Sequence, residues 1–176
     1  MFRCLGRIVI IGMTLSWLLG VCDHAARAGG PPSNENSVES DLAIIVNTTN
    51  PVEGMSLPEL RKVFLGERSR WPNGRRITLV MMEPGQPERK ALVREVCQMN
   101  ESDFSRHFLQ GVFTGEVFVS PKTLASPVGV RKFVFNVPGA IGYMRASDVD
   151  STLKVIRVDG RLPSDREYSL RIRAAQ

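Results

Sequence analysis

Residues 42–66, LAIIVNTTNPVEGMSLPELRKVFLG, decide the fold. They open with five consecutive apolar residues, Leu42 to Val46, a run typical of a strand that is covered on both faces in an α/β sheet. A helix is predicted to begin after Ser56, because Ser56 is a favourable N-cap and Glu59 completes a capping box three residues later. The predicted apolar stripe of this helix ends before Gly66 and consists of Leu57, Leu60, Val63 and Phe64.

The rest of the chain alternates predicted helices with apolar strands. The expected strands cover residues 77–82, 140–144, 153–158 and 168–172, and residues 114–125 are expected to form a surface loop. The expected inward-facing sets of the other three helices are Leu92, Val93, Val96 and Cys97, then Phe104, Phe108, Val112 and Phe113, and finally Val130, Phe133 and Val134. The order β-α-β-α-α-α-β-β-β predicts a three-layer α/β domain, with helices on both faces of a mixed sheet of about five strands.

The N-terminal segment, residues 1–28, is predicted to be a secretory signal peptide. Two arginines precede an apolar stretch over residues 8–21, and a small-residue site, Ala-Arg-Ala, ends at Ala28. We expect cleavage after Ala28 and a periplasmic protein that is not inserted in the membrane. A lipoprotein anchored through Cys22 is the alternative, and Val21 argues against it because a small residue is favoured just before a lipidated cysteine.

Residues 29–40, GGPPSNENSVES, are expected to form a flexible linker, and residues 41–176 a single domain. Residues 1–28 contain three arginines and one aspartate, so the formal net charge of +5 falls to +3 after cleavage. The remaining basic residues are scattered among acids and are not interleaved with aromatic residues. This pattern argues against binding of nucleic acid.

The mature sequence contains no pattern typical of a catalytic or metal site. Its only histidine, His107, is expected to be an ordinary half-buried helix residue, and its only cysteine, Cys97, a core thiol. One thiol and one histidine cannot form a closed zinc site without carboxylates at unrelated spacings. Glycine-rich phosphate loops of the GK[ST] or GxGxxG type are also missing. We therefore expect a protein that is not an enzyme and that uses no cofactor or metal.

Two strand-end loops are candidates for binding an anion. In an open α/β sheet, ligands gather where strand ends lead into helix N-termini, whose unpaired N–H groups and dipole favour negative charge. The candidate residues are Asn47, Thr48 and Thr49 in the first loop and Gly85, Gln86 and Arg89 in the second. A structural role is the alternative: the first loop then caps a strand end, and Gly85 is present only for a positive φ.

Four motifs resemble the substrate-binding proteins of phosphate ABC transporters: FLG at 64–66 with WPNG at 71–74, VFTG at 112–115 and NVPGAIGY at 136–143. The similarity runs in order over residues 41–170. It implies a type II periplasmic-binding-protein fold. It also implies a single lobe, because full members of that family clamp phosphate between two lobes and are about twice as long.

The second candidate loop departs from the pattern of that family. The resemblance implies a Ser-Gly-Thr run where this chain has Gln86, Pro87 and Glu88. Proline has no N–H to donate, and a carboxylate would repel a phosphate dianion. One contact between like unit charges costs about 4 kcal/mol at 4 Å and an effective dielectric constant of 20. Arg89 or Arg61 could compensate this charge. Tight phosphate binding is therefore not expected.

Two functions follow from these observations. The first is a secreted, non-catalytic domain related to the phosphate-uptake binding proteins, with weak or no binding of a phosphate-like anion. The second is a periplasmic interaction module that has lost its ligand and that forms a homodimer or docks on an envelope protein, because a lone lobe exposes a face that a partner would cover.

Overall fold

The computed structural model describes residues 40–173, so the predicted signal peptide and residues 29–39 of the predicted linker lie outside the described residues. None of the helices within this range is long and apolar enough to cross a membrane. The elements are β1 (Ser40–Asn47), β2 (Gly54–Met55), α1 (Leu57–Phe64), β3 (Thr78–Met82), α2 (Pro87–Glu95), α3 (Glu101–Thr114), β4 (Lys122–Leu124), α4 (Pro127–Asn136), β5 (Ala140–Arg145), the 3-10 turn η1 (Ala146–Asp148), β6 (Leu153–Val155), β7 (Arg157–Val158) and β8 (Arg171–Ile172).

The main sheet has six strands in the order β4-β3-β5-β1-β6, and β8 also pairs with β1. Strands β4, β3 and β5 are parallel to one another, whereas β1 is antiparallel to β5, β6 and β8. The mixed sheet is therefore confirmed. Strand β4 lies inside the segment that was expected to be a surface loop. Its three residues show no apolar pattern, but they pair with Val80, Met81 and Met82 of β3.

The predicted first helix, α1, forms as the sequence indicates. The Ser56 side chain accepts a hydrogen bond from the Glu59 amide, and the Glu59 carboxylate accepts bonds from the Ser56 amide and hydroxyl. These bonds from Ser56 hold the pKa of Glu59 below its ordinary value. Gly66 follows the helix with φ 74°, the left-handed conformation that ends a helix at a glycine.

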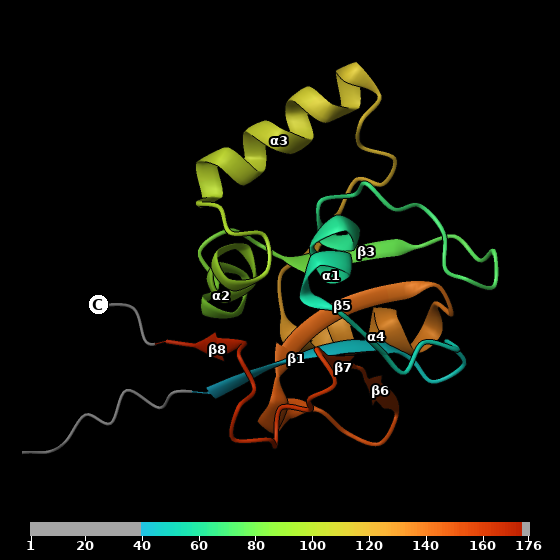
Figure 1. Cartoon of the computed structure of the whole chain (residues 1–176), viewed down its shortest axis with the longest axis vertical. Coiled ribbons are helices and arrows are strands. Elements are labelled where there is room, and N and C mark those ends of the chain that lie inside the picture. The colour runs from blue at the N-terminus through green and yellow to red at the C-terminus, as the bar shows by residue number, and fades with distance from the viewer. Residues whose placement is uncertain (1–39, 174–176) are drawn as a thin grey trace, which may run out of the picture. The chain divides into compact units, whose positions relative to one another are not determined.

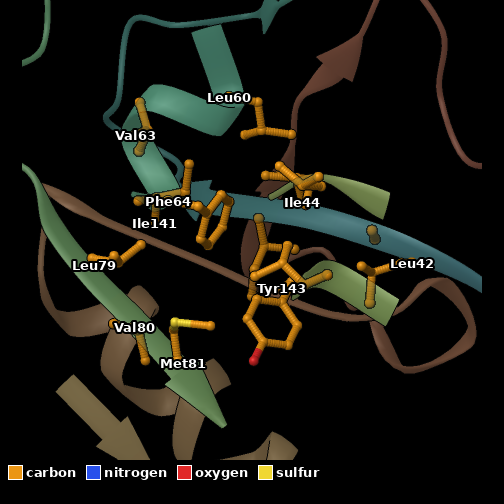
Figure 2. Packing of buried hydrophobic residues seen from close by; sticks show 14 of the residues in the cluster. Leu42, Ile44, Leu60, Val63, Phe64, Leu79, Val80, Met81, Ile141 and Tyr143 are labelled. Carbon is orange, nitrogen blue, oxygen red and sulfur yellow. The ribbon is translucent and has the colours of Figure 1, made fainter. Parts of the chain in front are cut away.

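Helices cover both faces of the sheet. Helix α4 packs on one face against β1, β3 and β5, and α2 packs on the other (Figure 1). Two neighbouring residues of β5, Gly142 and Tyr143, face opposite sides of the sheet. Gly142 lies beneath Val130 and Val134 of α4, where a Cβ would approach Val130 to 3.0 Å. Tyr143 points the other way and meets Phe64 of α1 edge to face, with ring centroids 6.0 Å apart (Figure 2).

Helix α3 differs from its prediction. Phe104 is buried and Phe108 is half-buried, as expected, but Val112 and Phe113 are exposed. The inner face of the helix continues through Gly111 instead, where Val117 packs so closely that a Cβ would lie 2.3 Å from its side chain. Phe104, Phe108 and Val112 are spaced by four residues, and the helix turns about 40° beyond a full turn over each such step, so this stripe moves off the contact face.

The WPNG and PGA motifs contact each other. Trp71 is buried, and its Nε1 donates a hydrogen bond of 3.0 Å to the carbonyl oxygen of Gly139. A Cβ at Gly139 would lie 2.2 Å from the backbone oxygen of Arg76. This contact fixes residues 70–76 against the start of β5, and it requires a glycine because no side chain fits between the two backbones.

We expect Gly139→Ala to lower the free energy of unfolding by about 2 kcal/mol, since the added methyl group forces two backbone segments apart. Urea denaturation monitored by circular dichroism measures the change. Gly129→Ala is the matched control: it lies in α4, a Cβ there would be at an ordinary 3.4 Å from Ser126 Oγ, and alanine favours helix, so its stability should be unchanged or higher by up to about 1 kcal/mol. Equal stabilities for the two variants would contradict this role of Gly139.

Candidate functional site

The second candidate loop lies at the carboxyl edge of the three parallel strands. Met82 at the end of β3 is in register with Leu124 at the end of β4, and the Glu83 amide donates to the Leu124 carbonyl. The chain then turns through Gly85, whose φ of 96° is accessible mainly to glycine. A Cβ at Gly85 would meet nothing within 4 Å, so the glycine serves the turn and not a close approach.

Helix α2 begins in this loop with few free donors. Gln86 occupies the N-cap position, but its side chain caps no amide. Pro87 follows at the first helical position and has no N–H. The Lys90 amide already donates to the Gln86 carbonyl. The amides of Glu88 and Arg89 are therefore what the first turn offers to a ligand.

Arg89, the predicted cationic ligand, is buried and bound within the domain. Its side chain is 7% exposed. Nη1 donates to the Met82 carbonyl at 2.7 Å, while Nε and Nη2 donate to both carboxylate oxygens of Glu101 at 2.5 to 3.2 Å. The guanidinium also lies 5.6 Å from the centroid of the Phe104 ring. This arrangement ties the N-terminus of α2 to β3 and to the first turn of α3.

Glu88 is paired as well. Its carboxylate is 5% exposed and accepts a hydrogen bond of 2.5 Å from Nε of Arg145, the last residue of β5. Arg145 also lies 3.4 Å from the Ser40 hydroxyl through Nη1. The compensating cation is thus Arg145, and not Arg89 or Arg61. Arg61 donates instead to the side chain of Gln98 at 3.0 Å.

Two ion pairs lie at this edge. Two carboxylates, Glu88 and Glu101, face two guanidinium groups, Arg145 and Arg89, and each pair has hydrogen-bond geometry. A bound dianion would have to compete with carboxylates that already hold both cations. The buried members of these pairs, Arg89 and Glu88, resist separation, because each would be left without a partner in a poorly solvated place.

In the first candidate loop, the side chain of Asn47 forms hydrogen bonds with backbone groups of the domain. Asn47 is 5% exposed, and its Nδ2 donates to the carbonyl oxygens of Val134 and Phe135 in the last turn of α4. Its Oδ1 accepts bonds from the amide and the hydroxyl of Thr49. Both polar atoms of the Asn47 side chain, Nδ2 and Oδ1, therefore have hydrogen-bond partners inside the domain. Thr48 and Thr49 are exposed, and the Thr49 hydroxyl lies 3.5 Å from Arg75 Nη1.

The structure does not bring the two candidate loops together. Because β1 is antiparallel to β5 and β5 is parallel to β3, the carboxyl end of β1 lies at the opposite edge of the sheet from the carboxyl end of β3. Asn47, Thr48 and Thr49 therefore cannot share one ligand with Gly85, Gln86 and Arg89.

Sequence analysis missed two residues of the charged edge, Glu101 and Arg145. Glu101 opens α3 and reaches back to α2, and its position in the first turn of a capped helix gave no hint of this long-range pairing. Arg145 could have been found, because a strand parallel to β3 must end beside the start of α2. That prediction would have required knowing that β5 runs parallel to β3.

Cys97, Tyr143 and His107 are packed into the domain. Burial raises the pKa of the Cys97 thiol to about 12, in agreement with a core thiol. Burial also raises the pKa of Tyr143, whose hydroxyl accepts a bond of 3.0 Å from the Met82 amide. His107 is half-buried, with Nε2 2.9 Å from the Leu65 carbonyl oxygen. Within residues 40–173, no group of three or more histidine, cysteine or acidic residues is placed to hold a metal ion.

Comparison with solved structures finds proteins with a similar fold. No protein-family model and no curated protein matches the sequence. A protein from Clostridium perfringens described as a phosphate ABC transporter substrate-binding protein, with bound phosphate, superimposes with a TM-score of 0.64 and 20% identity over 77% of this chain and 54% of its own. An ABC-type phosphate transport receptor from Vibrio cholerae gives 0.62 and 18%, covering 76% and 54%. PstS from Borrelia burgdorferi gives 0.61 and 12%, covering 77% and 55%.

The chain has a phosphate-binding-protein-like fold. It spans about half the length of these structures, and the identities of 12 to 20% establish the fold alone. The fold implied by the resemblance of the FLG, WPNG and PGAIGY motifs is confirmed.

We expect Asn47→Ala to lower the free energy of unfolding by about 1–3 kcal/mol, since the carbonyls at the end of α4 and the Thr49 amide lose their partner. Thermal or urea unfolding measures this loss. Thr48→Ala, at the exposed neighbouring position, should change stability by less than about 0.5 kcal/mol. An Asn47→Ala protein as stable as the parent would show that this side chain is not a structural clamp.

We expect Arg89→Met to destabilise the domain by about 2–3 kcal/mol, because it leaves the Glu101 carboxylate and the Met82 carbonyl without their donor. The comparison variant is Arg94→Met, which removes an arginine from the same helix whose ion pair with Glu95 is solvent-exposed. Its effect should stay below about 1 kcal/mol. Similar losses in chemical denaturation for both variants would argue against a structural role for the Arg89 pair.

Proposed function

We propose that this chain is a non-catalytic, solute-binding-like domain related to the phosphate receptors, and that it binds phosphate weakly or not at all. The observation that carries the proposal is the pairing of Arg89, whose guanidinium is held by Glu101 and by the Met82 carbonyl. The structural neighbours described as phosphate receptors support the solute-binding relationship. The predicted leader adds export to the periplasm, with a linker over residues 29–40 and a single domain over residues 41–176.

Three features of the carboxyl edge support weak binding. The first turn of α2 contains a proline and presents two amides. Each nearby guanidinium already has a carboxylate partner. No side-chain hydroxyl stands at positions 86–88, where the resemblance implies a Ser-Gly-Thr run. A phosphate dianion would thus receive few charge-assisted hydrogen bonds, and these are the strong ones in oxyanion recognition.

Isothermal titration with phosphate and sulfate tests the proposal. We expect no saturable heat for the parent protein below about 1 mM ligand, because two amides alone supply too little free energy for tighter binding. A dissociation constant for phosphate below about 10 µM would overturn the proposal.

A gain of binding is expected from the combined substitutions Gln86→Ser, Pro87→Gly and Glu88→Thr. They restore two hydroxyls and one amide, and they release Arg145 from Glu88, so phosphate affinity should rise at least about tenfold. Glu53→Gln is the control for net charge, since it also removes a carboxylate paired with a cation, Lys154, but away from the edge of β3. If the combined variant gains nothing, these positions do not limit binding.

A second function is favoured by one observation. Several large apolar side chains are exposed on α3 and directly after it, with Phe113 at 83% exposure and Phe118 at 59%. Exposed apolar surface, where it is contiguous, marks interaction sites in soluble proteins. The alternative proposal is therefore an interaction module that has kept the fold and lost the ligand.

A further inference from the structure

Basic residues gather at the end of the sheet where β3 and β5 begin and where β1 and α4 end. The segments that meet at this end are residues 42–52, 68–82 and 117–147, and none of them contains an acidic residue. Residues 68–82 alone contain four arginines. In this part of the chain the basic residues are therefore not scattered among acids, in contrast to the expectation from the sequence.

A hairpin over residues 69–77 carries three of these arginines. Arg70 and Arg76 lie opposite each other across the hairpin, and Arg75 reaches the turn after β1, where its Nη1 lies 3.5 Å from the Thr49 hydroxyl. All three are exposed, and none forms an ion pair with a carboxylate of residues 40–173. Like charges directly opposite each other destabilise a strand pair, so folding of the hairpin does not account for Arg70 and Arg76.

An exposed aromatic ring lies at the same end. Phe135, in the last turn of α4, is 52% exposed. Hydrogen bonds connect it with the hairpin, because Asn47 Nδ2 donates to the Phe135 carbonyl, and the Thr49 hydroxyl, which lies beside Arg75, donates to Asn47 Oδ1. Figure 1 shows the hairpin and the turn after β1 at one end of the sheet. This end therefore presents arginines together with an apolar ring.

The positive charge of the hairpin is not balanced by the acids beside it. Glu53, which follows β1, pairs with Lys154, and Asp150, which precedes β6, pairs with Arg131.

The arrangement of the arginines indicates the form of the partner. Arg75 and Arg76 are successive residues of an extended segment, so their side chains leave opposite faces of the hairpin and do not converge on one small anion. A surface that carries many negative charges, approached by the end of the hairpin, matches this arrangement.

The chemistry of the exposed side chains favours a lipid surface. Guanidinium groups bind phosphate through two parallel hydrogen bonds, and anionic membranes attract arginine by electrostatics. A phenylalanine next to such cations can enter the boundary between head groups and acyl chains. A membrane thus supplies a partner for both kinds of side chain at this end, phosphate for the arginines and an apolar layer for the ring.

We propose that Arg70, Arg75, Arg76 and Phe135 form a peripheral docking surface for membranes that contain anionic phospholipids. The arginines bind head-group phosphates, and the ring of Phe135 enters the head-group layer. The domain lies on the membrane and is not inserted in it. Since Arg89 lies at the opposite edge of the sheet, this docking surface is independent of the candidate anion site.

Vesicle co-sedimentation of the chain from Gly29 tests the docking surface. Residues 1–28 are left out because their apolar stretch would itself bind lipid, and the buried core of the described domain lies entirely within residues 42–172. The protein should bind phosphatidylcholine vesicles that contain about 30% phosphatidylglycerol, and not phosphatidylcholine alone. Raising the NaCl concentration from about 50 to about 500 mM should release it.

Substitution of the hairpin arginines should abolish most of this binding. The triple variant Arg70→Gln, Arg75→Gln and Arg76→Gln should bind the anionic vesicles about 100-fold more weakly, with an unchanged thermal unfolding midpoint. Arg76→Gln alone should weaken binding about fivefold. This single variant keeps the test valid if the triple variant is unstable, because the Arg76 side chain makes no hydrogen bond within residues 40–173. Phe135→Ser should also cost about fivefold, without a change in salt dependence.

A matched control removes the same net charge elsewhere. It combines Arg94→Gln, Arg106→Gln and Arg166→Gln, three exposed arginines of α2, α3 and the segment before β8. Its affinity for anionic vesicles should stay within about threefold of the parent, because the arginines of the hairpin are intact.

Four results would overturn the proposal: no binding to anionic vesicles, equal binding to neutral ones, a triple variant that binds like the parent, or a control that loses as much as the triple variant. Tighter binding to a DNA duplex or to polyglutamate than to the vesicles would also overturn it, because the surface would then belong to nucleic acid or to an acidic protein. Calorimetry with phosphate reports on the other edge of the sheet, so the two proposals can fail separately.

Discussion

The antiparallel pairing of β1 with β5 is the constraint on which the rest of the domain depends. Five residue pairs, from Leu42 with Arg145 to Val46 with Ile141, join the two strands in the middle of the sheet. The other side of β1 is covered by β6 at one end and β8 at the other. All five residues from Leu42 to Val46 are fully buried. Helices α4 and α2 cover the two faces of β1, and this cover explains why the strand is a continuous apolar run and not an alternating one.

The same pairing divides the polar residues between the two edges of the sheet. Reversal of β1 sends Asn47 to the edge where α4 ends, and there an amide side chain satisfies helix carbonyls that have no intrahelical donor. The parallel strands β3 and β5 end at the other edge, and there α2 begins beside Arg145. At one edge, therefore, Asn47 caps the last turn of α4, while the other edge holds the ion pairs beside α2. Similar loops in the sequence acquire different roles from strand direction alone.

The fold could be predicted from the sequence to the extent that its signals are local. The capping box at Ser56, the buried run of β1 and the core position of Cys97 depend on neighbouring residues, and the structure confirms them. Strand β4 was missed because its three residues carry no apolar pattern and are held by pairing with β3. The site was less accessible, since the partners of Glu88 and Arg89 are 57 and 12 residues away in sequence. Strand direction and long-range pairs are set by the whole sheet.

Helix α3 depends on both local signals and long-range contacts. Its position is set locally by Asn100, which caps the helix, and by Gly115, which ends it in the left-handed conformation. Its orientation is set by distant contacts, because Glu101 is bound to Arg89 and Gly111 is covered by Val117. These contacts turn the small Gly111 inward and leave the larger Leu109, Val112 and Phe113 outside. The exposure of these three residues is therefore set by long-range contacts of the inner face, which the spacing of apolar residues along the helix does not show.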